Sequence, residues 1–84
     1  MKKLGVVSDK AKMLSKRPLV ELVGTDRVLI ENHMGVLAYS PEQIEIKVVY
    51  GKLSVAGNNL RLMQMNGEQM VISGKIDGIQ LFRR

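Results

Sequence analysis

Few side chains in this 84-residue sequence could do acid–base, nucleophilic or metal chemistry. His33 is the only histidine, and the chain has no cysteine. A histidine-rich metal site, a thiolate zinc site and a cysteine nucleophile are therefore excluded. No nucleophile-elbow sequence accompanies His33. Its neighbours Asn32 and Met34-Gly35 indicate a hairpin tip, so we expect no catalytic or ligand role for His33.

The carboxylates and glycines also favour surface and turn positions over a reactive site. Glu42, Glu45, Glu68 and Asp77 flank expected turns, where charged groups are normally solvated. Hydrolysis by paired acids needs two carboxylates held together at a cleft, and the pattern brings no two inward. The stretch SGKIDGIQL leads into a strand-like run rather than a helix, unlike a phosphate-binding loop. We expect no enzyme activity, no cofactor and no metal.

The net charge of +5 is compatible with nucleic acid, an anionic membrane face or an acidic protein partner. Lys2, Lys3, Lys10 and Lys12 are candidate contacts to an anionic surface, although a merely solubilising basic tail explains them equally well. Single-strand nucleic-acid sites combine basic grooves with stacking aromatics, and this chain has only Tyr39, Tyr50 and Phe82. A small basic β-barrel that binds single-stranded nucleic acid is kept as the alternative function.

The spacing of apolar residues, which predicts the elements that position these side chains, changes at Pro18. Before it, Leu4, Val7, Ala11 and Leu14 follow a helical spacing, so residues 1–17 are predicted to be a basic N-terminal tail or short helix. Residues 18–84 alternate with the period of β-strands and form the predicted β domain. The sequence contains no signal-peptide pattern and no apolar run long enough to cross a bilayer. We expect a soluble, cytoplasmic protein.

A repeat of 16 residues organises the β domain. Gly35, Gly51 and Gly67 are evenly spaced, and aligning on them brings the apolar residues of successive units into columns. Each unit is predicted to be strand, glycine turn, strand, turn. Asn66-Gly67 is the strongest turn and predicts a type I′ hairpin, because both residues tolerate positive φ. The second turns are predicted at Ser40-Pro41-Glu42, Gly57-Asn58-Asn59 and Ser73-Gly74-Lys75.

This repeat predicts an all-β fold, an antiparallel meander of about eight strands rolled into a small barrel or sandwich. A short β-solenoid, in which repeats stack as coils, is the alternative. Met63 and Met65 are expected on the face opposite Leu60 and Leu62, with Val49 giving a similar second apolar face in the preceding unit. A strand that is apolar on both faces suggests contact with another layer or subunit. Val49, Met63 and Met65 are therefore the candidate interaction surface for a protein partner or a second copy.

Several motifs resemble those of the YabP/YqfC family of sporulation proteins, and the YqfC branch in particular. They include Ile30-Glu31-Asn32-His33 with Gly35, Gly51-Lys52-Leu53 with Gly57 and Leu60, and Gly74-Lys75-Ile76. The resemblance covers about residues 18–82 and rests on turn and core positions.

This resemblance implies a small protein that is made in the mother cell of a sporulating bacterium and needed for normal spore development. It carries over no catalytic residues. It also implies that the protein acts beside a YqfD-like membrane protein at the forespore envelope. Together with the residues, it predicts a non-enzymatic assembly module that contacts a protein partner and touches the outer forespore membrane peripherally.

Overall fold

The structure is a computed structural model, and it describes residues 16–84. The predicted N-terminal helix or tail and the four lysines at positions 2, 3, 10 and 12 lie outside the described residues, apart from the last two residues of the 1–17 segment. The described part contains strands, turns and irregular connections and no helix. The strands are β1 Leu19–Val23, β2 Arg27–Glu31, β3 Val36–Tyr39, β4 Gln43–Val48, β5 Gly51–Met65 and β6 Gln69–Arg83.

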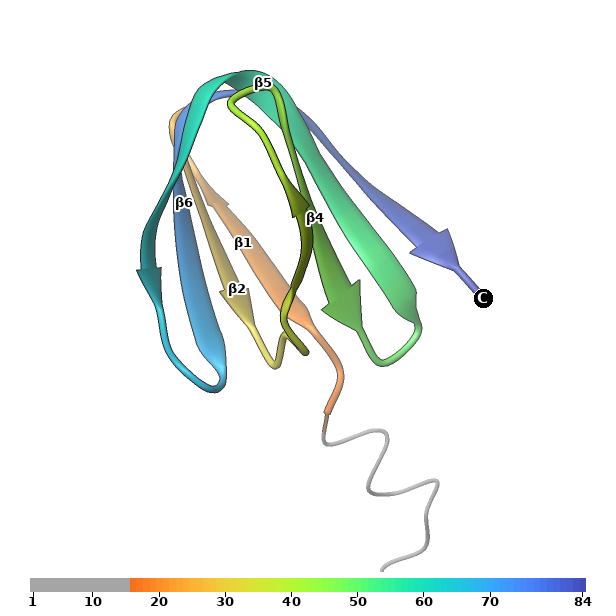
Figure 1. Ribbon diagram of the computed structural model, residues 1–84. Coiled ribbons are helices and arrows are strands. Elements are labelled where there is room, and N and C mark those ends of the chain that lie inside the picture. The colour runs from red at the N-terminus through yellow and green to blue at the C-terminus, as the bar shows by residue number, and fades with distance from the viewer. Residues whose placement is uncertain (1–15) are drawn as a thin grey trace, which may run out of the picture.

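All six strands belong to one sheet, in the order β1-β2-β6-β5-β4-β3, and every neighbouring pair is antiparallel. The predicted all-β antiparallel fold is therefore confirmed, and the solenoid alternative is wrong. The sheet is folded into two facing arms but not closed into a barrel (Figure 1). The simple meander is interrupted once, because β2 pairs with β6 and not with β3.

The two longest strands explain why six strands are present where about eight were predicted. β5 and β6 each run for 15 residues and arch over the top of the molecule (Figure 1). The turns predicted at Gly57-Asn58-Asn59 and Ser73-Gly74-Lys75 are bends inside these continuous strands, not reversals of the chain. Register shifts between Ala56 and Gly57 and between Asn58 and Arg61 mark the bend of β5. Such bulges increase local twist and curvature.

Glycine is required at this bend because two backbones approach closely there. A Cβ at Gly57 would overlap the carbonyl oxygen of Lys75. A Cβ at Gly74 would lie 2.6 Å from the carbonyl oxygen of Asn59, and Gly74 also has a φ of +136°, which L-residues rarely adopt. The sequence correctly predicts an unusual backbone conformation at these positions. The chain bends the sheet there and does not reverse its direction.

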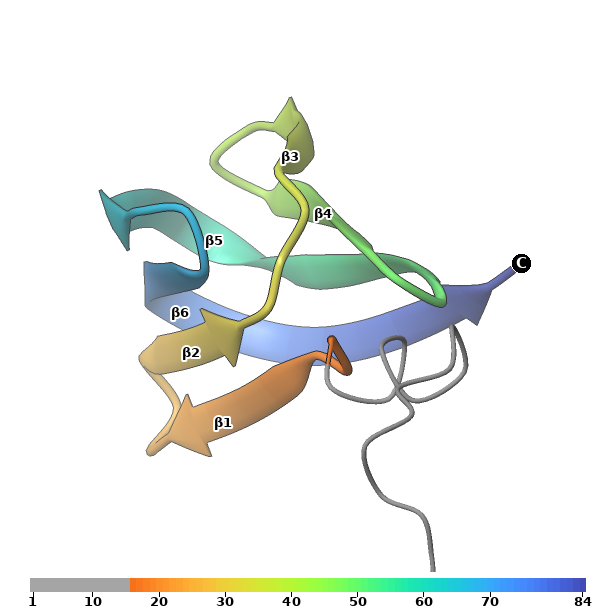
Figure 2. The same ribbon diagram turned by 90° about the horizontal axis from the view of Figure 1, so that it is seen from below.

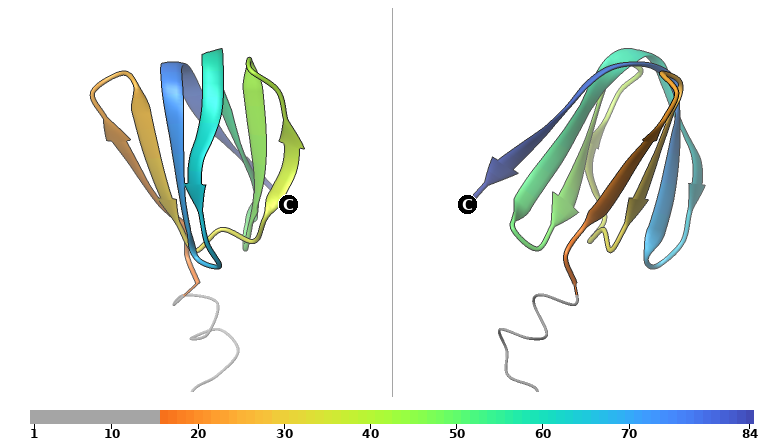
Figure 3. Two further views of the ribbon diagram at one scale, coloured as in Figure 1. Left: turned by 60° about the vertical axis from the view of Figure 1, so that its left-hand side comes forward. Right: turned by 180° about the vertical axis from the view of Figure 1, so that it is seen from behind.

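Folding at this bend creates the core between two layers. One layer contains β1, β2, the first half of β6 and the second half of β5, and the other contains the remaining halves with β4 and β3. The two arms spread apart below the bend (Figure 3). Repeat columns supply much of the core. The buried apolar side chains are Val28, Ile30, Ile44, Ile46, Val48, Leu53, Val55, Leu60, Met70 and Ile72.

The connection between β2 and β3 crosses from one layer to the other on the open side of the fold (Figure 2). It begins at Asn32, which has a φ of 64°, and ends at Gly35, which has a φ of 111°. The backbone N–H of Asn32 donates to the carbonyl of Glu68 at 2.7 Å, and that of Met34 donates to the carbonyl of Lys47, also at 2.7 Å. These bonds join the ends of the two layers.

Candidate interaction surfaces

His33 lies inside the crossing connection, so its predicted place at a hairpin tip is wrong. The side chain is 8% exposed. The backbone N–H of Gly35 donates to Nδ1 at 3.0 Å, and Nε2 lies 2.9 Å from the carbonyl oxygen of Asn66. Because Nδ1 accepts, the ring proton belongs on Nε2, which donates to Asn66. Both nitrogens are engaged by the backbone, and His33 ties the crossing connection to the β5–β6 hairpin.

The three residues of the candidate interaction surface occupy two different places. Val49 lies in the two-residue turn between β4 and β5, since Val48 pairs with Gly51, and so it does not project from a strand face. Met63 and Met65 lie near the end of β5 and are 56% and 52% exposed.

The predicted shared outer face of these methionines is wrong because β5 has a further register shift between Leu62 and Gln64. The shift places Met65 opposite the buried Met70, at the margin of the core face. The sequence pattern alone does not reveal a bulge of this kind. The interaction role of the methionines stays a prediction.

Exposed apolar side chains gather on strands that border the two layers. The end of β5 pairs only with β6 among residues 16–84, because β4 pairs with β5 only as far as Ala56. β1 and β3 are the outermost strands of the sheet. An unpaired strand edge with apolar side chains is a template for another chain. The large exposed side chains are Leu19, Leu22, Val23, Met34, Leu37, Tyr39, Met63, Met65, Leu81 and Phe82.

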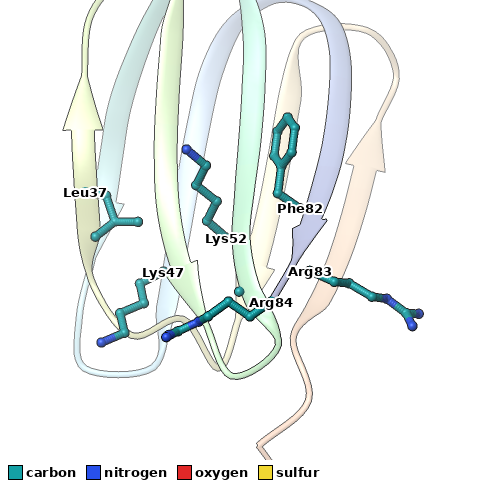
Figure 4. A pocket seen from close by; sticks show the side chains of 7 residues that line it. Leu37, Lys47, Lys52, Phe82, Arg83 and Arg84 are labelled. Carbon is teal, nitrogen blue, oxygen red and sulfur yellow. The ribbon is translucent and has the colours of Figure 1, made fainter.

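A shallow cationic groove of about 470 Å³ lies on the outer face near the C-terminal end of β6 (Figure 4). Leu37 and Phe82 give it apolar patches, and Lys47, Lys52 and Arg84 give it positive charge, while the side chain of Arg83 points away from them (Figure 4). The Lys52 Nζ lies 5.5 Å from the centre of the Phe82 ring and 3.3 Å from an oxygen of Glu45. The Glu45 carboxylate neutralises part of this charge locally.

Sequence reasoning did not bring the terminal Arg83 and Arg84 together with Leu37, Lys47 and Lys52. These residues come from β3, β4 and β5, which are brought beside the end of β6 only by the strand order. Alternation within each strand indicates an outward side chain. It does not indicate which outward side chains of different strands meet.

The described part of the chain offers neither a cluster of metal ligands nor a membrane-spanning helix. Within residues 16–84, no group of three or more His, Asp or Glu side chains is arranged to hold a metal ion. No helix in the same part of the chain is long and apolar enough to span a membrane.

Comparisons with known proteins agree with the motifs of the sequence. The sequence model of the YabP family matches residues 15–83, which is most of the chain. The chain is similar to the uncharacterized protein YqfC of Bacillus subtilis (strain 168), with 27% identity over 63 residues. The alignment covers 75% of this chain and 68% of that protein. No solved structure matches the chain.

Proposed function

Because this chain belongs to the YabP family, we propose that it is a non-enzymatic sporulation protein that acts as a protein–protein assembly module. It works in the mother cell of a sporulating bacterium, at the forespore envelope. The family resemblance supports the developmental setting, and the exposed apolar side chains of the β domain support the mode of action. The protein partner is a YqfD-like membrane protein.

The observation that carries this proposal is the exposed apolar edge at the end of β5. Met63 and Met65 keep about half of their surface exposed near the end of β5, where β6 is the one neighbouring strand among the described residues. Methionine is flexible and polarizable, so it adapts well to a partner surface. A strand edge of this kind can accept a further strand through backbone hydrogen bonds, while alternate side chains provide specificity.

Peripheral membrane contact is a second part of the proposal. Lys2, Lys3, Lys10 and Lys12 give the N-terminal segment a positive charge. Each Lys near an anionic leaflet contributes about 1 kcal/mol to membrane binding. This attraction would hold the module at the outer forespore membrane beside its membrane partner. Charge reversal of the four lysines is expected to weaken vesicle binding and to leave protein–protein contacts intact.

Affinity capture from sporulating cells tests the proposal. The tagged chain should retain a YqfD-like membrane protein. Deletion of the gene that encodes this chain should lower the yield of heat-resistant spores. The double variant Met63→Ser/Met65→Ser should lose the partner while its circular dichroism spectrum remains that of a folded β protein. The matched control Leu19→Ser/Val23→Ser changes two exposed side chains on β1 and should retain the partner. Normal spore yield without the chain would contradict the proposal.

Binding of single-stranded nucleic acid remains the rival function, and the cationic groove with Phe82 is the observation that favours it. The closed barrel predicted for such a binder is absent, but a groove with an exposed aromatic and several cations can stack bases and contact phosphates. A titration with labelled single-stranded RNA at several salt concentrations separates the two functions. Tight binding with a steep salt dependence, lost in Lys47→Glu/Lys52→Glu, would favour the rival.

A further inference from the structure

Two lysines lie directly opposite each other on neighbouring strands of the cationic groove. Lys47 on β4 pairs with Lys52 on β5, and Lys52 pairs in turn with Phe82 on β6. All three residues line the groove (Figure 4). Like charges directly opposite each other destabilise strand pairing. Glu45 lies 3.3 Å from the Lys52 ammonium group, so one carboxylate stands against two neighbouring cations.

Further cations lie beside this pair of lysines. Arg84 lines the cationic groove, and with Arg17 and Arg83 it also lines an adjoining hollow. The groove and the hollow are lined by Lys and Arg residues from several strands, and by no Asp or Glu among the described residues. Neither Lys47 nor Arg84 has an ion-pair partner within residues 16–84. This end of the sheet therefore carries positive charge that the described part of the chain does not neutralise.

We propose that the cationic groove docks onto an anionic phospholipid leaflet, with lipid phosphates between Lys47, Lys52 and Arg84. Leu37 and Phe82 then meet the apolar boundary of the leaflet. This inference deepens the peripheral membrane contact proposed above and rests on it, because it assigns a face of the β domain to the membrane. A lipid phosphate between the two lysines replaces their mutual repulsion with two attractions. Basic residues near an anionic leaflet each contribute to binding.

The uncharged side chains of the groove favour a lipid surface over a nucleic acid. Leu37 is 54% exposed and Phe82 is 42% exposed, beside the cations. Elements that bind at a membrane interface combine Phe or Leu side chains with basic residues. A nucleic acid base instead needs an open aromatic face on which to stack. The Lys52 Nζ lies over one face of the Phe82 ring, 5.5 Å from its centre, and hinders stacking there.

The groove also lies close to the point where the basic N-terminal segment joins the β domain. Arg17 lines the hollow that shares Arg84 with the groove. Residues 1–15, with the four lysines at positions 2, 3, 10 and 12, directly precede the described part of the chain. Two linked sites that bind one surface reinforce each other, because the first contact raises the effective concentration of the second. The segment and the groove can therefore meet the same leaflet.

Co-sedimentation of the full chain with vesicles tests this docking. Vesicles of phosphatidylcholine mixed with phosphatidylglycerol should bind the chain, and vesicles of phosphatidylcholine alone should not. Lys47→Gln/Arg84→Gln should weaken binding about 25-fold, because each lost charge accounts for about fivefold. The matched control Arg61→Gln/Lys75→Gln removes two exposed charges near the bend and should bind as the wild type does.

The opposed lysines add a test that a purely structural residue would fail. Lys47→Gln removes the repulsion from Lys52, so the variant should unfold at a higher temperature while it binds anionic vesicles more weakly. The control Arg61→Gln should change neither property. Circular dichroism during heating measures the unfolding temperature. A lower unfolding temperature of Lys47→Gln would contradict the repulsion from which the docking is argued.

A tryptophan reporter tests which face meets the lipid, since the chain has no tryptophan. Phe82→Trp should shift its fluorescence to shorter wavelengths on anionic vesicles and be quenched by lipids with brominated tails. Tyr39→Trp places the same reporter in a separate hollow with Pro41 and Leu60, beside the bend, and should show neither change.

Equal vesicle binding by the wild type and Lys47→Gln/Arg84→Gln, or equal quenching of the two tryptophan variants, would overturn the docking. Single-stranded RNA binding that is lost in Lys47→Gln/Arg84→Gln, with vesicle binding unchanged, would assign the groove to nucleic acid instead. The N-terminal lysines can hold the chain on vesicles when the groove does not dock, and partner capture is a separate measurement. Failure of this inference and failure of the proposed function are therefore distinguishable.

Discussion

His33 shows how a single side chain holds together parts of the chain that are far apart in sequence. It lies between β2 and β3, yet its ring bonds to Asn66 in the turn that joins β5 and β6. The other ring nitrogen accepts from Gly35, two residues away. These contacts fix the crossing connection against the hairpin on which both long strands depend. The buried imidazole, hydrogen-bonded through both ring nitrogens, therefore has a structural role in this fold.

Replacing His33 should therefore lower stability. His33→Ala removes both hydrogen bonds and leaves the Gly35 N–H and the Asn66 carbonyl without these partners, so the free energy of unfolding should fall by about 2–3 kcal/mol. His33→Asn can keep the acceptor for Gly35, and His33→Gln can keep the donor to Asn66, so each should recover part of the loss. Urea unfolding followed by circular dichroism measures this, since the chain has no tryptophan. Equal stability of wild type and His33→Ala would contradict the bonding.

The glycines at the bend give a second prediction. Gly57→Ala should destabilise the fold by roughly 3 kcal/mol or more, because the new methyl group would overlap the Lys75 backbone, which cannot move aside as a flexible side chain can. Gly74→Ala should be similarly costly because of its positive φ. Gly67→Ala is the matched control, since that Cβ would meet no heavy atom within 4 Å. Thermal unfolding of the three variants should separate the first two from the third.

At the scale of elements, the β5–β6 hairpin positions most of the molecule. β4 pairs with the first half of β5, and β2 pairs with the first half of β6. Both layers are therefore attached to the same two strands. The turn is closed by the N–H of Asn66, which donates to Gln69 at 2.9 Å. The Asn66 side chain also accepts from the N–H groups of Glu68 and Gln69. The predicted hairpin is confirmed, but neither Asn66 nor Gly67 has positive φ, so the predicted type I′ turn is wrong.

Asn66→Ala should consequently weaken the hairpin without abolishing the fold. It removes two hydrogen bonds from a side chain to the backbone in an exposed turn, and the free energy of unfolding should fall by about 1 kcal/mol. Asn66→Asp keeps the accepting oxygen and should stay close to the wild type. Asn66→Gly, which would favour a type I′ turn, should not stabilise the protein. A stabilising effect of that glycine would show that the turn in solution differs.

Local sequence predicted the strands and the core better than the connections between them. Val28, Ile44 and Leu60, which the repeat places in one column, are buried, and Ile76 of the same column is partly buried, because alternation directly reports which face meets the core. Gly57-Asn58-Asn59 has the composition of a turn, and the chain does bend there. Whether such a segment reverses the chain or folds a sheet depends on partners distant in sequence, such as Lys75. For the same reason, the sequence could not show that the ends of β5 and β6 each have one neighbouring strand among the described residues.

At the scale of the whole molecule, the described strands account for a complete two-layer core. The buried apolar residues lie between Val28 and Ile72, and β1 covers one border of the sheet from Leu19 onward. The Asn32 side chain donates to the carbonyl of Arg17 at 2.8 Å, which attaches the segment before β1 to the crossing connection. A fold of this size buries a modest share of its surface, so its stability depends on keeping these layers intact.

Removal of residues 1–15 tests the division between a basic segment and a β domain. The shortened chain should keep its β-type circular dichroism spectrum and unfold cooperatively, with a change in unfolding free energy below about 0.5 kcal/mol, because it retains all six strands of residues 16–84 and the Arg17 anchor. It loses four lysines, and its binding to anionic vesicles should fall at low salt. A matched full-length chain with Lys2, Lys3, Lys10 and Lys12 changed to Gln should lose vesicle binding equally, which assigns that loss to charge. Unfolding of the shortened chain would instead place residues 1–15 within the β domain.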